Sequence, residues 1–260
     1  MDVDPLNHRE DDHIVGPRAR FGVIAPSTNT VVEQDLSRLR LDGVTFHTGR
    51  MYIEHPGLAS DEEFEQLLGQ IRVSIDVAVR DVVTALPSAM LMGMSAETFW
   101  GGVAGNAEFE RRISELSGGR SVTTGAASCR AALDAFGAER IAVFSPYQPI
   151  ADEQVGTYFT EAGFDVAAIT GLRCSTATSI AQVGPSRIVE VIEQIGGDRD
   201  DVDAVVQVGT NLNFVDQAAA LEAELAKPVI AINMATLWHG LRSNGLDDRP
   251  AGVGRLLAEH

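Results

Sequence analysis

Polar side chains follow apolar runs of this chain at points where strands of a sheet would end. Ser95 comes directly after the run Ala89–Met94, and Thr210 with Asn211 follows a run that ends at Gly209. Hydroxyl and amide groups donate hydrogen bonds without carrying charge, and such donors stabilise a carboxylate or a developing enolate-type oxyanion. These residues therefore predict a cleft that holds a small carboxylate.

The two runs share one design. When Met94 is aligned with Gly209, a hydroxyl residue follows in both copies, and a phenylalanine stands at the fifth following position in both (Ser95 and Thr210, Phe99 and Phe214). Ala96 extends the first of these strand ends. Two similar strand ends predict one cleft built by two related halves of the chain.

Three further strand ends carry polar residues. The strand 21–25 runs into Ser27-Thr28-Asn29, the strand 140–144 runs into Tyr147, and Asn233 ends the strand 228–232. A helix is expected at 31–39, with Glu33, Asp35 and Arg38 on its polar faces. Two interpretations of Ser27 and Asn29 are then open: they bind an anion at the start of this helix, or they only cap it.

Proton-transfer chemistry has four candidates in these regions. Tyr147 has an unperturbed pKa of about 10, so it would serve as a proton donor rather than as a base. Glu97 is either an acid beside the strand end or a solvent-facing carboxylate. Asp216 and His239 have the same two readings, as site groups or as surface groups of helices. Tyr147 is the candidate that we place in the site.

The elements that must position these residues alternate along the chain. Continuous apolar strands separated by amphipathic helices predict an α/β fold with parallel sheets buried on both faces. Ligands of such folds lie at the carboxyl ends of the strands. Strands are expected at 21–25, 44–47, 89–94, 140–144, 166–170, 203–208 and 228–232, and the helices between them include 61–84, 106–116, 150–162, 188–195 and 235–243.

Composition and charge exclude several classes of function. The chain has 260 residues, 45% of them hydrophobic and 22% charged, as in ordinary globular proteins. A formal net charge of -17 argues against nucleic acid and anionic membranes as partners, because both need clustered Lys and Arg. A small anion is still compatible with local donors in a cleft. The chain lacks a membrane-spanning apolar stretch and a signal-peptide pattern, so we expect a soluble, cytoplasmic protein.

Cofactor and metal signatures are missing. No G-x-G-x-x-G follows the first strand and no G-x-x-x-x-G-K-[ST] occurs, so nicotinamide and nucleotide cofactors are not expected. The two cysteines, Cys129 and Cys174, form neither a disulfide framework nor a metal pattern, and Cys129 is expected to be a small buried thiol rather than a reactive one. His8 and His13 with Asp11 and Asp12 are read as part of a solvated tail rather than as a metal site.

Several of these motifs together resemble those of a known family. The runs Ala25-Pro26-Ser27-Thr28-Asn29-Thr30, Leu91 to Gly102, Ser145-Pro146-Tyr147, and Lys227-Pro228-Val229-Ile230 with Leu237-Trp238 occur in the same order and at similar spacing. They are similar to the maleate cis-trans isomerase and arylmalonate decarboxylase group of the aspartate/glutamate racemase superfamily. The likeness extends over nearly the whole chain from about residue 20.

The resemblance implies two Rossmann-like halves related by a pseudo-twofold axis, with the active-site cleft between them. On that basis we expect a first half at 19–120 plus 232–260 and a second half at 121–231. Residues 1–18 are rich in charged residues and poor in apolar ones, so we expect a disordered or loosely attached tail there. The resemblance also implies chemistry without a cofactor, and relatives in this superfamily often form homodimers. The carboxylate-binding set would comprise Ser27, Asn29, Met94, Ser95, Ala96, Tyr147, Gly209, Thr210 and Asn211.

The chain departs from the family pattern where the reactive cysteines are expected. Met94 (or Gly93, if the alignment shifts by one) stands at the first position and Gly209 stands at the second. Neither residue can donate or accept a proton. The sequence therefore predicts a cofactor-independent lyase or isomerase that acts on a small carboxylic or dicarboxylic acid through an enolate-type intermediate, with a non-cysteine acid or base. The alternative is a catalytically inactive family member that binds a small carboxylate.

Overall fold

The structure, a computed structural model, describes residues 14–196, 198–250 and 252–260. Its strands form two four-stranded sheets in which every neighbouring pair is parallel. The first has the order β2-β1-β3-β4 and the second the order β6-β5-β7-β8, so the two sheets have the same winding. This confirms the predicted α/β fold. The strands are β1 Ala19–Pro26, β2 Val44–Met51, β3 Ala89–Met92, β4 Ser121–Thr123, β5 Arg140–Ser145, β6 Asp165–Gly171, β7 Ala204–Gln207 and β8 Val229–Ala231.

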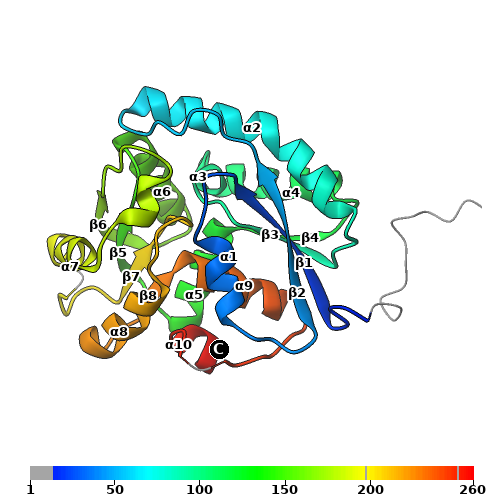
Figure 1. Ribbon diagram of the computed structural model, residues 1–260. Helices are drawn as coiled ribbons and strands as arrows, with labels where there is room; N and C mark the ends of the chain where they lie inside the picture. The colour runs from blue at the N-terminus through cyan, green and yellow to red at the C-terminus, as the bar shows by residue number, and fades with distance from the viewer. Residues whose placement is uncertain (1–13, 197, 251) are drawn as a thin grey trace, which may run out of the picture.

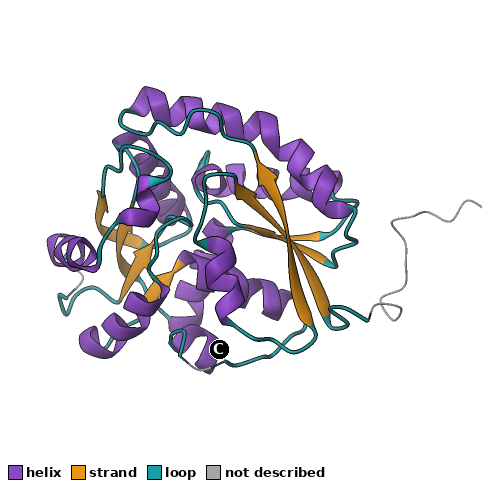
Figure 2. Ribbon diagram, viewed as in Figure 1, coloured by secondary structure: helices purple, strands orange, loops and turns teal. Residues whose placement is uncertain are grey.

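Helices cover both faces of these sheets (Figure 2). In Figure 1 the first sheet lies on the right and the second on the left, with α1, α5 and α9 between them and α2 across the top. The helices are α1 Val32–Arg38, α2 Asp61–Val83, α3 Ala96–Phe99, α4 Gly102–Leu116, α5 Gly125–Phe136, α6 Pro149–Glu161, the 3₁₀ turn η2 Ser179–Gln182, α7 Pro185–Gln194, α8 Val215–Leu225, α9 Ile232–Ser243 and α10 Arg255–Glu259.

Local sequence explains the elements that frame the site. All residues of β3 are buried, as expected for a strand with helices on both faces. Helix α2 begins where the side chain of Ser60 accepts a hydrogen bond from the N–H of Glu63, at 3.2 Å. One stripe of apolar residues at helical spacing is buried along α2, from Phe64 to Val83, and it packs this helix along its length against the first sheet.

Two elements differ from the sequence-based expectation. Strand β4 at Ser121–Thr123 pairs with β3, so the first sheet extends past the expected boundary at residue 120. A strand of three residues is too short to produce a periodic pattern. Helix α4 begins at Gly102 rather than near Asn106, directly after Gly101, whose φ of 77° is left-handed. The first turn of α4 consists mainly of small residues, so the sequence shows no amphipathic pattern there.

The expected tail at 1–18 lies mostly outside the described residues, and so do His8, Asp11, Asp12 and His13. The described residues of this segment, 14–18, contact the rest of the fold. The guanidinium of Arg18 donates to both carboxylate oxygens of Asp248, and the Arg18 N–H donates to the carbonyl of Gly43 at 2.9 Å. Arg18 thus attaches the chain just before β1 to the rest of the fold.

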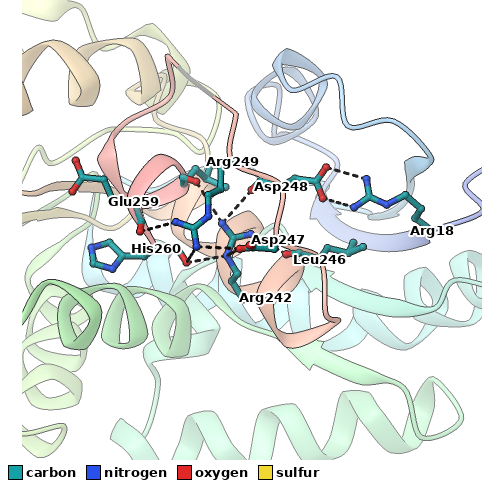
Figure 3. Close-up of polar contacts among 9 residues, drawn as sticks. Arg18, Arg242, Leu246, Asp247, Asp248, Arg249, Glu259 and His260 are labelled. Atoms are coloured by element: carbon teal, nitrogen blue, oxygen red, sulfur yellow. Dashed lines mark hydrogen bonds and ion pairs between the residues drawn. The ribbon is translucent and has the colours of Figure 1, made fainter.

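The C-terminal segment is tied back onto the fold (Figure 3). Helix α9 packs on β3 and β4 of the first sheet and on α5. The guanidinium of Arg242 donates to the carbonyls of Leu246, Asp248 and His260, at 2.9, 3.1 and 3.1 Å. Arg249 adds a hydrogen bond to the carbonyl of Glu259 at 2.7 Å. Arg242 of α9 thus holds the chain on both sides of α10 in place. Helix α10 was not predicted from the sequence, because it is too short to show a periodic apolar pattern.

In the part of the chain that the structure describes, no helix is long and apolar enough to cross a membrane.

Candidate active site

A cavity of about 50 Å³ lies where the carboxyl ends of strands from both sheets meet. The loops after β1, β3, β5 and β7 all contribute to its wall. This is the place predicted for a ligand in an open parallel sheet. The cavity is lined by Pro26, Thr28, Asn29, Leu67, Ile71, Met94, Ser95, Ala96, Pro146, Tyr147, Ala177, Ile180, Gly209, Thr210 and Asn211.

Three hydroxyl groups form the polar centre of this wall. The hydroxyls of Ser95 and Tyr147 are joined by a hydrogen bond, in which either oxygen can be the donor. Ser95 Oγ also accepts the N–H of Thr210 at 3.3 Å. Ser95 belongs to the first half and the other two belong to the second, so the centre exists only when both halves meet.

Two asparagines hold the surrounding loops together. Asn29 Oδ1 accepts the N–H groups of Val31 and Val32 at 2.9 and 3.0 Å, which caps α1, and its Nδ2 donates to Thr210 Oγ1 at 3.3 Å. Asn211 Oδ1 accepts the N–H of Thr30 at 2.9 Å, and its Nδ2 donates to the carbonyl of Ala177 at 2.8 Å. Asn29 therefore caps the helix and also lines the cavity, and its binding of an anion stays a prediction.

The rest of the wall is apolar. Leu67 and Ile71 come from α2, and Ala177 and Ile180 come from the segment around η2. They could not be predicted from the sequence, because an apolar stripe on a helix has the same pattern whether it covers a sheet or borders a cavity. Ala177 and Ile180 both belong to the irregular segment 174–183, which forms this side of the cavity. This wall suits the apolar part of a small ligand.

Tyr147 is held from its backbone as well as from its hydroxyl. Its N–H donates to Ser145 Oγ at 3.0 Å, and its carbonyl accepts from Arg173 Nη1 at 2.6 Å. The same Arg173 atom donates to Asp152 Oδ2, also at 2.6 Å, and Asp152 accepts from the hydroxyl of Ser145. The ring meets Phe64 edge-on, with centroids 5.4 Å apart. Few alternative positions remain for this side chain.

Burial raises the pKa of the Tyr147 hydroxyl well above its ordinary value, although the hydrogen bond with Ser95 opposes the shift. Tyr147 is therefore protonated at neutral pH, and its hydroxyl carries a hydrogen that can be donated. Among the described residues that line the cavity, it is the one titratable side chain. The wall is otherwise neutral, so an anion bound there would be held by dipoles rather than by a paired cation.

Met94, Ala96 and Gly209 line the cavity together with the hydroxyl groups. Gly209 has no room for a side chain, because a Cβ there would lie 2.5 Å from Cδ of Pro146. Gly93 lies outside this wall and borders a separate apolar cavity of about 10 Å³. Neither cysteine is among the lining residues. Cys129 is buried in α5, and Cys174 is buried shortly before the lining residues Ala177 and Ile180 in the chain. Burial raises the pKa of the Cys174 thiol to about 11.

The structure does not bring the other candidates into the cavity wall. Ser27 is exposed, and its hydroxyl accepts the N–H of Ile53 at 3.0 Å.

The three remaining acid or base candidates also lie outside the wall. Glu97 accepts a hydrogen bond from Arg72 at 2.8 Å. Asp216 pairs with Arg38 at the surface, and the ring of His239 lies 3.2 Å from Ser128 Oγ. Each of these side chains has a partner of its own, and none of them lines the cavity.

One charged residue departs from its expected environment. Asp35 was expected on a polar face of its helix, yet it is completely buried between α1 and α9. Its Oδ2 accepts from Asn233 Nδ2 at 2.7 Å, and the same amide donates to the carbonyl of Thr210 at 3.0 Å. Asn233 could be placed near the site from the sequence, because it follows a predicted strand. The inward orientation of Asp35 could not be predicted, because a helix of seven residues is too short to show which face is buried.

The cavity can hold a carboxylate against three hydroxyls and can deliver one proton from Tyr147. Within the described ranges, no group of three or more His, Cys, Asp or Glu side chains is placed to bind a metal ion.

Comparison with known proteins gives the family. A family model described as arylmalonate decarboxylase matches residues 21–257. A maleate isomerase of Pseudomonas putida is 26% identical over 251 residues, which cover 92% of this chain and 97% of that protein. The structure of Nocardia farcinica maleate cis-trans isomerase with a covalently bound succinylcysteine intermediate has a TM-score of 0.83 at 25% identity, covering 93% of this chain and 99% of that one.

An unliganded arylmalonate decarboxylase shares the fold, with a TM-score of 0.75 at 20% identity and coverage of 93% of this chain and 100% of that one. The match of the family model includes strands of both sheets and all of the residues that line the cavity. The chain belongs to the arylmalonate decarboxylase family.

Proposed function

We propose that the chain is a cofactor-independent lyase or isomerase that acts on a small carboxylic or dicarboxylic acid through an enolate-type intermediate. The observation that carries this proposal is the joined hydroxyl pair of Ser95 and Tyr147 inside the cavity. Hydroxyl donors fixed before the reaction begins stabilise negative charge that develops on a bound carboxylate. The similarity to maleate isomerases supports the substrate class.

A single proton donor favours decarboxylation within this proposal. In that reaction the bond between Cα and one carboxylate breaks, CO₂ leaves, and the electron pair moves into an enolate of the remaining carboxylate. Tyr147 then transfers its proton to Cα and recovers one from water. Isomerisation or racemisation also requires a base or a nucleophile, and Tyr147 is the one titratable group among the lining residues.

The apolar wall suggests where the rest of the substrate lies. Leu67, Ile71 and Ile180 line the cavity together with the hydroxyl-bearing residues. Buried apolar surface stabilises a ligand group of the same kind and penalises a second charge that lacks a partner. A malonate with one small apolar substituent fits this division: one carboxylate is held by the hydroxyls, and the other leaves.

A second candidate function is carboxylate binding without turnover. Met94 and Gly209 stand where the family resemblance expects cysteines, and Gly209 leaves no room for any side chain. The relative from Nocardia farcinica holds a covalent cysteine intermediate, which this cavity wall cannot form. If Tyr147 cannot transfer its proton, the same hydroxyls still bind an anion, and the chain acts as a binder.

One experiment separates these functions. The chain is first screened by thermal shift with malonate, phenylmalonate, maleate, succinate and phenylacetate. Ligands that raise the melting temperature are then incubated with the chain in D₂O and followed by NMR for CO₂ loss or for deuterium at Cα. Stabilisation with turnover supports the enzyme, and stabilisation without turnover across the panel supports the binder. No stabilisation by any of these acids contradicts both.

We also propose that the chain forms a homodimer through the outer face of α2. Val73 and Val77 lie one turn apart there, and their exposures of 80% and 48% are high for apolar residues. Two antiparallel α2 helices centred on residue 71 would set each Glu62 opposite an Arg80, which makes the face self-complementary in charge. Sedimentation velocity should give a dimer that Val73→Glu converts to a monomer. A monomeric unchanged chain would contradict this.

A further inference from the structure

Asp35 is a fully buried carboxylate with one oxygen that has no hydrogen bond. Its Oδ2 accepts from Asn233, whereas its Oδ1 has no hydrogen-bond donor in the part of the chain that the structure describes. The closest charge to Oδ1 is Arg38 Nε at 3.5 Å, which also makes no hydrogen bond. A buried polar atom without a hydrogen bond costs free energy, so this arrangement does not serve stability.

The oxygen that is satisfied belongs to a closed circuit that reaches the cavity. Asn233 uses its two amide hydrogens on Asp35 Oδ2 and on the carbonyl of Thr210, at 2.7 and 3.0 Å. Thr210 Oγ1 accepts from Asn29, and Asn29 in turn caps α1, the helix that carries Asp35. The circuit returns to its starting helix after linking three segments that are distant in the sequence. Each member restrains the next.

We propose that Asp35 is a positioning residue, which acts through Asn233 to fix Thr210 at the cavity wall. The effect on ligands rests on the proposed function, because Thr210 matters there as part of a carboxylate site. An ionised acceptor makes a stronger hydrogen bond than a neutral one, so the charge of Asp35 holds the Asn233 amide in the orientation that serves Thr210. A neutral residue of the same shape would hold it less firmly.

The circuit is expected to respond to pH. Burial raises the pKa of Asp35 to about 6, although the bond from Asn233 and the charge of Arg38 lower it. The charged groups that face it are Arg38 on its own helix and, beyond that guanidinium, Asp216 at the start of α8. Below about pH 6 the carboxyl takes up a proton and its bond to Asn233 weakens. Thr210 should then be less restrained.

Stability and positioning should move in opposite directions in Asp35→Asn. The pKa of Asp35 is higher in the fold than its ordinary value of 3.8, so the ionised group lowers stability above about pH 6 and this loss disappears toward pH 4. Asp35→Asn should therefore raise the melting temperature at pH 8, with a difference that shrinks as the pH falls to 4. A residue that only stabilised the fold would lower it instead.

Hydrogen exchange of the ligand-free chain tests the positioning role directly. The Thr210 N–H, which donates to Ser95, should lose protection by about three- to tenfold in Asp35→Asn, together with its neighbours in 208–212. Asp216→Asn is the matched control, because it removes a carboxylate from the same Arg38 without touching Asn233. That control should leave the exchange of 208–212 unchanged.

Two results overturn the proposal: unchanged exchange at 208–212 in Asp35→Asn, or faster exchange throughout the chain with a lower melting temperature. If Asp35→Asn does not fold, the unchanged chain decides. Its protection at 208–212, corrected for the intrinsic exchange rate, should fall between pH 7 and pH 5, and a constant value overturns the proposal. These outcomes need no ligand, so failure of malonate, maleate and succinate to bind would defeat the proposed function alone.

Discussion

The hydroxyl of Ser95 at the end of β3 is hydrogen-bonded to the hydroxyl of Tyr147 after β5, across the junction between the two halves. Both side chains are buried, and both line the cavity. Neither half could form this pair alone. The two similar strand ends also meet here, because the N–H of Thr210 after β7 donates to Ser95 Oγ at 3.3 Å and both residues line the cavity.

The first prediction concerns Ser95. Ser95→Ala removes the partner of the Tyr147 hydroxyl and the acceptor of the Thr210 N–H. The affinity for the best carboxylate of the panel should fall by about three- to tenfold, as expected for a lost hydrogen bond. Calorimetric titration measures this. Ser128→Ala is the control: Ser128 is equally buried but donates within α5, so its loss should change stability and not affinity.

The second prediction concerns the thiols. Cys129 and Cys174 lie outside the cavity wall, so Cys129→Ala and Cys174→Ala should bind a carboxylate as the unchanged chain does. Iodoacetamide should modify the native protein slowly at pH 7, because burial raises the pKa of Cys174 to about 11 and that of Cys129 further still. Mass spectrometry follows the modification. Rapid labelling that a bound ligand prevents would place a thiol in the site.

The third prediction concerns Gly209. A Cβ at this position would lie 2.5 Å from Cδ and 2.7 Å from Cγ of Pro146, the residue before Tyr147. Gly209→Ala should therefore displace the Pro146–Tyr147 turn, lower stability by about 1–3 kcal/mol and weaken carboxylate binding.

Gly156→Ala provides the comparison for Gly209→Ala. Gly156 lies within α6, where nothing is within 4 Å of the added methyl group. This substitution should stabilise the chain by about 0.5–1 kcal/mol, because alanine favours a helix interior over glycine. Chemical denaturation of both variants gives the two free energies of unfolding. Equal values for the two variants would contradict the steric account.

The sequence supported the prediction of the strand ends, because residues that end buried parallel strands must meet at one edge of a sheet. Asn29, Ser95, Tyr147 and Thr210 do line a common cavity. Ser27 does not line it, because its hydroxyl accepts a hydrogen bond from the N–H of Ile53 instead. Pattern alone does not fix the orientation of a side chain within a turn.

The apolar wall and Asp35 could not be predicted in the same way. Leu67 and Ile71 belong to a regular amphipathic stripe, and only the position of α2 over the sheet decides that two of its residues face a cavity. Asp35 is a charged residue at a buried position, which reverses the usual preference. Such exceptions depend on a distant partner, here Asn233, that no local pattern reveals.

The most direct test of the account is Tyr147→Phe, measured beside Tyr158→Phe. Both tyrosines are buried, but Tyr158 lies in α6 outside the cavity wall. Tyr147→Phe should weaken carboxylate binding by about 1–3 kcal/mol and lower any turnover by about 10²- to 10⁴-fold, whereas Tyr158→Phe should leave both unchanged. Calorimetric titration and NMR in D₂O measure the two effects. Unchanged affinity and unchanged turnover in Tyr147→Phe would contradict the assignment of this cavity as the site.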